Sequence, residues 1–175
     1  MLLPRVSLII TSYNQQGYLS EAIESAIDQT VAAFEIIVAD DHSTMDGSIE
    51  AIREYEAQSP GLVRGLFQEK NVGIPKNRNS ALQMVKGDYV AILDGDDRLL
   101  PRFIEQHAAA LTASPQAHVS YSNRYDVNQL GERRPARSQS ATLGRCSRLH
   151  RARSQRYSAL NGGKVRLGES GRISR

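Results

Sequence analysis

Short apolar runs alternate along the first 122 residues with segments in which apolar residues recur every three or four positions. Apolar runs that are rich in β-branched residues and bounded by turn residues predict buried strands, and the longer spacing predicts amphipathic helices. The pattern predicts strands at residues 6–10, 34–39, 62–68, 90–93 and 117–122, and helices at residues 18–29, 49–58, 75–85 and 101–113.

Predicted strands and helices follow one another regularly. Strands that alternate with helices of roughly 10–15 residues are typical of parallel βαβ units with right-handed crossovers, so we predict an α/β fold with a mostly parallel sheet. Polar residues follow the first, second and fourth predicted strands. In a parallel sheet these strand ends meet at one edge, where α/β proteins bind their ligands.

The fourth predicted strand ends in the acidic sequence Asp94-Gly95-Asp96-Asp97. Three carboxylates in so short a stretch repel one another unless a positive group lies nearby. Mg²⁺ and Mn²⁺ prefer oxygen ligands and often bridge to a substrate phosphate, so this turn is a candidate metal site. The alternative is a solvated acidic turn that leads into the helix near Pro101.

Charge divides the chain into two parts. Residues 1–132 contain 10 Lys+Arg and 18 Asp+Glu, whereas residues 133–175 contain 12 Lys+Arg and a single glutamate. The second part has eleven arginines, seven serines and no apolar run longer than two residues, so it buries too little surface to fold. We therefore predict a domain at residues 1–131 and a disordered basic tail at residues 132–175.

Two other interpretations of the tail remain open. Arginine-rich segments bind nucleic acid and other polyanions, although only Tyr157 is available in the tail to stack on a base. The abrupt change of composition near Arg133 favours the other interpretation, in which the tail is an out-of-frame or truncated ending and not native coding sequence.

The chain has no sequence feature of a membrane-spanning or secreted protein. It contains no run of about 18 apolar residues, and its first five residues are too short for a signal peptide. Cys146 is the single cysteine, which excludes an intrachain disulfide. We therefore expect a cytoplasmic protein without a transmembrane segment, either free or peripheral at the inner face of the membrane.

Four segments resemble the nucleotide-binding half of the family 2 glycosyltransferases, which have the GT-A fold. They are residues 6–14 (VSLIITSYN), 34–48 (FEIIVADDHSTMDGS), 71–81 (NVGIPKNRNSA) and 87–101 (GDYVAILDGDDRLLP). Their order and spacing also resemble the family, over residues 4–131. The resemblance implies a Rossmann-like three-layer α/β/α sandwich that binds a nucleotide sugar, with a UDP-sugar favoured, together with Mn²⁺ or Mg²⁺.

The resemblance assigns three residues to the nucleoside. Thr11 and Tyr13 correspond to residues that hold the base and ribose, the first through its hydroxyl and the second through a stacking ring. Asp41 corresponds to an aspartate that accepts a hydrogen bond from uracil N3–H, which would select uridine over cytidine. Tyr13 could instead pack on the neighbouring helix, and Asp40 is expected to cap a helix or order the loop.

Three further residues are assigned to the diphosphate and the metal. Arg78 is expected to face the diphosphate, because a guanidinium stays charged and matches phosphate oxygens. Lys76 is a weaker candidate for that role, and Arg78 could instead be an ordinary surface arginine. Asp94 and Asp96 correspond to the DXD motif that binds the metal, with Asp94 reaching the ribose or a metal-bound water and Asp96 ligating the metal on the diphosphate.

The chain departs from the family after residue 131. Family members continue into a portion that forms the acceptor site and supplies an acidic general base, but after Glu132 the only acidic residue is Glu169, in the tail. The catalytic base is therefore unassigned. We expect a truncated inverting glycosyltransferase, with little activity as written, that acts on a hydroxyl of a saccharide or lipid-linked acceptor. The alternative is a non-catalytic nucleotide-binding remnant whose basic tail binds nucleic acid or another polyanion.

Overall fold

The computed structural model of the chain describes residues 3–122 and 125, together with the backbone of five two-residue strands further along. The main elements are β1 (Val6–Ser12), α1 (Gln16–Ile27), β2 (Glu35–Asp40), α2 (Ser48–Gln58), β3 (Val63–Phe67), α3 (Ile74–Leu82), β4 (Tyr89–Asp94) and α4 (Phe103–Ala113). The short strands are β5 (Asp126–Val127), β6 (Arg133–Arg134), β7 (Arg156–Tyr157), β8 (Arg166–Leu167) and β9 (Ile173–Ser174). The predicted disorder of the tail lies outside the residues described in full.

The central sheet has the strand order β3-β2-β1-β4, with the short β7 next to β4. All of these pairs are parallel, which confirms the predicted α/β fold. Since β1 lies between β2 and β4, its carboxyl end adjoins the ends of both. Thr11 lies opposite Asp94 on one side, and Ser12 lies opposite Asp40 on the other.

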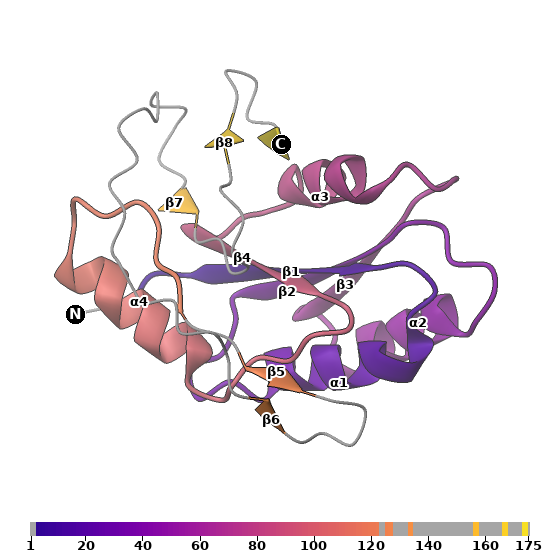
Figure 1. Ribbon diagram of the computed structural model, residues 1–175, viewed down its shortest axis with the longest axis horizontal. Coiled ribbons are helices and arrows are strands. Elements are labelled where there is room, and N and C mark those ends of the chain that lie inside the picture. The colour runs from indigo at the N-terminus through magenta and orange to yellow at the C-terminus, as the bar shows by residue number, and fades with distance from the viewer. Residues whose placement is uncertain are drawn as a thin grey trace.

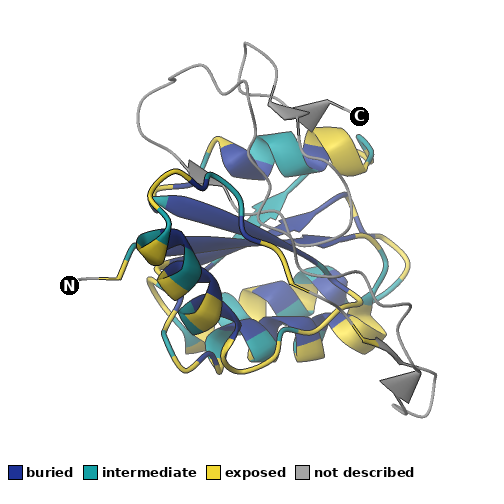
Figure 2. Cartoon of the chain, turned by 60° about the vertical axis from the view of Figure 1, so that its left-hand side comes forward, coloured by how far each residue is buried: buried dark blue, intermediate teal, exposed yellow. Residues whose placement is uncertain are grey.

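Helices cover both faces of the sheet. One face carries α3 and the other carries α1, α2 and α4, which confirms the predicted three-layer sandwich (Figure 1). Buried residues of the helices gather toward the sheet, and exposed residues face outward (Figure 2). Among the described residues, no helix is long and apolar enough to cross a membrane.

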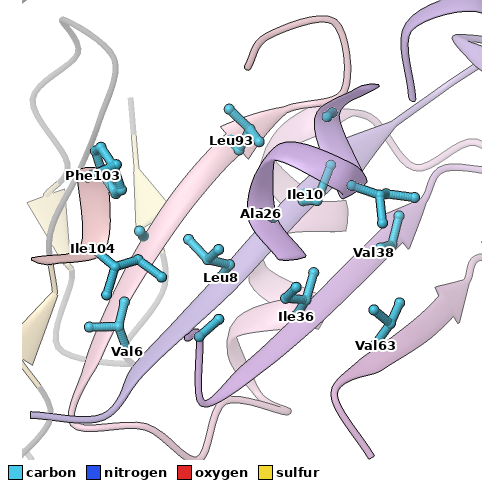
Figure 3. Close-up of a cluster of buried hydrophobic side chains, with 14 of the residues drawn as sticks. Val6, Leu8, Ile10, Ala26, Ile36, Val38, Val63, Leu93, Phe103 and Ile104 are labelled. Atoms are coloured by element: carbon cyan, nitrogen blue, oxygen red, sulfur yellow. The ribbon is translucent and has the colours of Figure 1, made fainter. Parts of the chain in front are cut away.

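Two hydrophobic cores lie on opposite faces of β1. Because side chains alternate along a strand, Leu8 and Ile10 point to one face and Ile9 to the other. Leu8 and Ile10 pack in the core shared with α1 and α4 (Figure 3), and Ile9 packs with Ala81 and Leu82 of α3. Burial of each such side chain contributes roughly 1.5–3 kcal/mol, so both faces stabilise the position of β1.

The predicted strand at residues 117–122 is wrong, because the structure describes these residues and none of them lies in a strand. A hydrogen bond of 2.7 Å joins Ser120 Oγ to His107 Nδ1 on α4, and Ala117 packs into the same core as Leu111 of that helix. The segment is therefore held by contacts with a helix, which its short apolar pattern does not distinguish from contacts in a sheet.

Several predicted boundaries differ by one to three residues from those observed. β1 extends to Ser12, because Thr11 and Ser12 continue its pairing with the neighbouring strands. β4 includes Asp94, which is therefore positioned by a strand and not by a loop. α4 begins at Phe103, since residues 101–102 form a turn.

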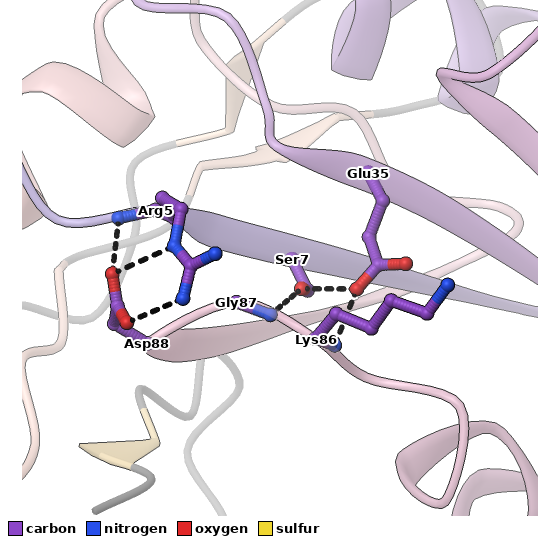
Figure 4. A network of polar contacts seen from close by, with 6 residues as sticks. All are labelled: Arg5, Ser7, Glu35, Lys86, Gly87 and Asp88. Carbon is purple, nitrogen blue, oxygen red and sulfur yellow. Dashed lines mark hydrogen bonds and ion pairs between the residues drawn. The ribbon is translucent and has the colours of Figure 1, made fainter.

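A polar network joins three strands at the amino-terminal edge of the sheet, and Figure 4 shows the part of it around Ser7 and Glu35. Glu35 Oε1 accepts hydrogen bonds from Ser7 Oγ at 2.7 Å and from the backbone N–H of Lys86 at 2.6 Å. Glu35 Oε2 accepts one from Arg64 Nη2 at 3.2 Å. The Ser7 hydroxyl also accepts a hydrogen bond from Gly87 N at 2.9 Å. The network fixes the loop between α3 and β4 against β1, β2 and β3.

Arg5 and Asp88 extend this network toward solvent (Figure 4). The Arg5 guanidinium donates to both Asp88 carboxylate oxygens, at 3.3 and 3.0 Å, and the Arg5 backbone N–H donates to one of them at 2.9 Å. These hydrogen bonds stabilise the ionised carboxyl and hold the pKa of Asp88 below its usual value.

Candidate functional site

Three of the predicted site residues meet at the carboxyl-terminal edge of the sheet. Thr11 Oγ1 donates a hydrogen bond of 3.1 Å to Asp94 Oδ1, and Arg78 Nη2 forms an ion pair with the same oxygen. Thr11 and Asp94 come from adjacent strands, whereas Arg78 comes from α3. The parallel arrangement brings Thr11 and Asp94 to one edge, as the strand pattern predicts, and α3 adds Arg78.

The acidic turn after β4 lies close to β1. Asp97 N donates to Asp94 O at 2.9 Å, which closes the turn, and Gly95 N donates to Thr11 O at 2.8 Å. A Cβ atom at Gly95 would lie 2.9 Å from Thr11 O, so only glycine allows this approach. Asp96 is exposed at the turn.

Arg78 is positioned by Asn77, the buried residue that precedes it on α3. Asn77 Nδ2 donates to Ala39 O of β2 at 2.8 Å, and Asn77 Oδ1 accepts a hydrogen bond from Gln68 Nε2 at 3.1 Å. Gly73 precedes the helix with a φ of 83°, a left-handed conformation that favours glycine. These contacts fix the backbone of α3 over β2 and direct Arg78 to the strand ends.

Asp41 lies beside this helix start and is 4% exposed. Its Oδ1 accepts a hydrogen bond from Val72 N and its Oδ2 accepts one from Gly73 N, both at 2.8 Å. Asp41 therefore holds the turn from which α3 begins. Each carboxylate oxygen has a second lone pair, so the predicted hydrogen bond to uracil N3–H is compatible with these contacts and stays a prediction.

Tyr13 follows β1 directly and the residue is 47% exposed. The predicted stacking on a base needs an accessible ring, and the exposure of Tyr13 is compatible with it. Lys76, the weaker candidate for the diphosphate, is exposed on the first turn of α3.

Two loops of the site are joined by Asn14, which the sequence analysis missed. Asn14 Oδ1 accepts hydrogen bonds from Thr44 N and Met45 N, both at 3.2 Å, and Asn14 N donates to Ser43 Oγ at 2.8 Å. Asn14 has a φ of 50°, which asparagine tolerates better than most residues. The available signal was an asparagine in the polar loop that follows the first predicted strand.

Asp40 orders the second of these loops, which confirms one of its two predicted roles. Its Oδ1 accepts a hydrogen bond from Ser43 N at 2.7 Å, and its Oδ2 accepts one from Ser43 Oγ at 2.5 Å. Both carboxylate oxygens of this buried aspartate are thus used within its own loop. Asp40 and Asp41 are adjacent in sequence, yet Asp40 orders the loop after β2 and Asp41 holds the turn before α3.

The donor set at the acidic turn suits a hard divalent cation. Asp94 and Asp96 offer carboxylate oxygens, and Asp96 is exposed. Within the described residues, no cluster of three or more His, Cys, Asp or Glu side chains forms a complete metal site. Mg²⁺ and Mn²⁺ sites with one or two protein carboxylates are completed by water and substrate phosphates, so the residues present fit such a metal.

Comparison with protein families gives a match to the model described as Glycosyl transferase family 2, over residues 7–165. The matched range extends beyond residue 131, where the sequence analysis ends the domain. Among curated relatives, the glycosyltransferase MJ1057 of Methanocaldococcus jannaschii is 31% identical over 129 residues, covering 73% of this chain and 44% of the relative. The putative glycosyltransferase EpsE of Bacillus subtilis is 35% identical over 130 residues, covering 74% and 46%. The chain thus spans less than half the length of these relatives.

Solved structures of glycosyltransferases have the same fold. Residues 1–349 of Staphylococcus aureus TarS, in complex with UDP, align with a TM-score of 0.59 and 27% identity over 71% of this chain and 38% of that one. The mannosyltransferase PcManGT from Pyrobaculum calidifontis, in complex with GDP-Man and Mn²⁺, aligns with a TM-score of 0.61 and 27% identity over 70% and 36%. The predicted resemblance to the GT-A fold is confirmed.

Proposed function

Because the chain belongs to glycosyl transferase family 2, we propose that it forms the donor-binding part of an enzyme that transfers a sugar from a nucleotide sugar to an acceptor hydroxyl. The observation that carries this proposal is the meeting of Thr11, Arg78 and Asp94 at the edge where parallel sheets bind ligands. The complexes of TarS with UDP and of PcManGT with GDP-Man support the substrate class.

In the proposed complex, the diphosphate lies against the acidic turn. Asp96 and Asp94 would hold Mn²⁺ or Mg²⁺, which acts as a Lewis acid on the departing nucleoside diphosphate when bound. Arg78 supplies a second positive charge to the phosphate oxygens. The negative charge that develops when the glycosidic bond to phosphate breaks is thereby offset from two sides.

We further propose UDP as the nucleotide. Tyr13 provides an exposed ring for the base, and Asp41 provides an acceptor for uracil N3–H. Uracil has this proton and cytosine lacks it, so a buried carboxylate at this position discriminates between them. Both UDP and UDP-GlcNAc occur in the TarS complexes, which supports this assignment.

Transfer with inversion requires a base that removes the proton from the acceptor hydroxyl as it attacks the anomeric carbon. We assign this role to no described residue, because the family resemblance implies that the base lies in the portion after residue 131. We propose that the acceptor reacts through a hydroxyl group, and the resemblance implies a saccharide or a lipid-linked acceptor.

The proposal is tested by titrating UDP into the full chain by calorimetry, with and without Mn²⁺. We expect Mn²⁺ to tighten UDP binding, and Asp96→Ala to weaken binding in Mn²⁺ by about tenfold or more, since it removes a metal ligand. Glu54→Ala is the matched control, because it removes an exposed carboxylate from α2, away from the strand ends. UDP binding that responds neither to metal nor to Asp96→Ala would contradict the proposal and favour a non-catalytic remnant.

A further inference from the structure

Arg78 and Asp94 form an ion pair with each other, although the proposed function gives them different partners. Arg78 is expected to contact the diphosphate and Asp94 to contact the metal, yet Arg78 Nη2 donates to Asp94 Oδ1. Thr11 Oγ1 donates to the same oxygen. In the state described, one carboxylate oxygen of Asp94 therefore already receives two donors.

This ion pair is more than a surface contact. The Arg78 side chain is 25% exposed and the Asp94 side chain 35%, so solvent screens the pair only in part. Both residues come from fixed backbone, Asp94 through its pairing with β1 and Arg78 through the hydrogen bonds of Asn77. A cation that approaches Asp94 therefore has to compete with a guanidinium that is held in place.

The same ion pair leaves Arg78 incompletely satisfied. Its Nε is buried and has no hydrogen-bond partner among the described residues. A buried donor without a partner is unfavourable, and a guanidinium binds most strongly when two of its donors meet two oxygens. A diphosphate offers several oxygens, so it can engage donors that Asp94 leaves unused.

We propose that Arg78 excludes the metal from Asp94 in the nucleotide-free protein, and that a nucleoside diphosphate draws Arg78 away and opens the metal position. The proposal rests on the proposed function and adds a regulation of the same site. Metal and nucleotide then bind together, because the diphosphate supplies oxygens to the metal and also removes its competitor. By linkage, the metal strengthens nucleotide binding by the same factor as the nucleotide strengthens metal binding.

The test measures binding of Mn²⁺ alone to the full chain, by the electron paramagnetic resonance signal of free Mn²⁺. Arg78→Gln removes the positive charge and the paired N–H donors of the guanidinium. We expect this variant to bind Mn²⁺ about tenfold more tightly than the unsubstituted chain, which is the effect of losing one charged hydrogen bond. Arg78→Lys keeps the positive charge but lacks the paired guanidinium donors, so its gain in Mn²⁺ affinity should be smaller.

Arg98→Gln is the matched control for a general loss of positive charge. Arg98 follows the acidic turn directly, is exposed, and forms its ion pair with Glu21 at 2.9 Å. We expect this variant to bind Mn²⁺ like the unsubstituted chain. Repeating the titrations with UDP present should show that UDP strengthens Mn²⁺ binding less in Arg78→Gln than in the unsubstituted chain.

Two outcomes would overturn the inference. If Arg78→Gln binds Mn²⁺ no more tightly than the unsubstituted chain, the ion pair does not compete with the metal for Asp94. If Arg98→Gln gains as much Mn²⁺ affinity as Arg78→Gln, the effect comes from net charge and not from the ion pair. Neither outcome depends on UDP. If instead UDP fails to bind at any metal concentration, the proposed function fails, whatever the result for Mn²⁺ alone.

Discussion

The two edges of the sheet carry polar networks of similar composition but different completeness. At the amino-terminal edge, both carboxylate oxygens of Glu35 accept hydrogen bonds. The Ser7 hydroxyl both donates and accepts (Figure 4). At the carboxyl-terminal edge, Ser12 Oγ and Arg78 Nε are buried without a partner among the described residues. No other buried side-chain nitrogen or oxygen in the described part of the chain lacks a partner.

This difference separates structural from functional polar groups within one sheet. Buried polar groups in native proteins are nearly always hydrogen-bonded, because an unsatisfied one costs about 1–3 kcal/mol. A satisfied network stabilises the fold and leaves no buried donor that still lacks an acceptor. Unsatisfied donors and an exposed carboxylate retain the capacity to bind a ligand, which agrees with a binding site at the carboxyl-terminal edge.

Removing the carboxylate of Glu35 should give the largest effect on stability. Glu35→Ala leaves Ser7 Oγ, Lys86 N and part of Arg64 without an acceptor, so we expect a loss of about 3 kcal/mol in the free energy of unfolding. Urea denaturation measures this loss, and UDP affinity of the folded protein should stay unchanged. Glu35→Gln keeps one acceptor oxygen in place and should cost less. A large change in UDP affinity would show that the two edges are not independent.

A pair of glycine substitutions compares the edges directly. Gly87 and Gly95 lie near the two ends of β4, and at each an added Cβ would lie 2.9 Å from a backbone oxygen, of Arg5 and of Thr11 respectively. We expect Gly87→Ala and Gly95→Ala each to destabilise the fold by about 2 kcal/mol through overpacking. Only Gly95→Ala should also weaken UDP binding in Mn²⁺, because it displaces the acidic turn. Equal losses of UDP affinity in both variants would contradict the division of roles.

The smallest effect on stability is expected when the pH is lowered and Asp88 becomes protonated. Arg5 holds the pKa of Asp88 below its usual value, so the folded state binds this proton less readily than the unfolded state. The pair therefore stabilises the fold above the unfolded pKa of about 3.9, and this contribution is lost as pH falls through the lower folded pKa. Thermal melts from about pH 6 to pH 2 should fall less steeply for Asp88→Asn. Because both side chains are exposed, the difference should be small. An unchanged slope would show that the pair contributes no measurable stability.

The sequence predicts the sheet and much of the site because both follow from local patterns. Apolar β-branched runs identify β1, β2 and β4, and the parallel order then places Thr11 and Asp94 at the same edge without further information. Arg78 is predicted from resemblance alone, since nothing in its local sequence indicates that α3 lies over the strand ends.

Other features could not be predicted, because their partners are far apart in the chain. The hydrogen-bond partners of Glu35 are separated from it by 28, 29 and 51 positions in the sequence. No periodicity identifies a buried glutamate in a strand as the centre of such a network. Asp41 binds backbone groups 31 and 32 positions away, which a motif does not reveal. At residues 117–122 the local pattern was misleading, since the contacts with α4 determine the conformation.

The strand order β3-β2-β1-β4 also determines what the growing chain exposes during synthesis. β1, β2 and β3 leave the ribosome in succession and are neighbours in the sheet, whereas the other side of β1 pairs with residues 83 positions later. Until β4 has been synthesised, an apolar strand has a row of unpaired backbone groups, which is a template for association with other chains. A nascent chain released before residue 94 would therefore expose an aggregation-prone edge and would lack the acidic turn.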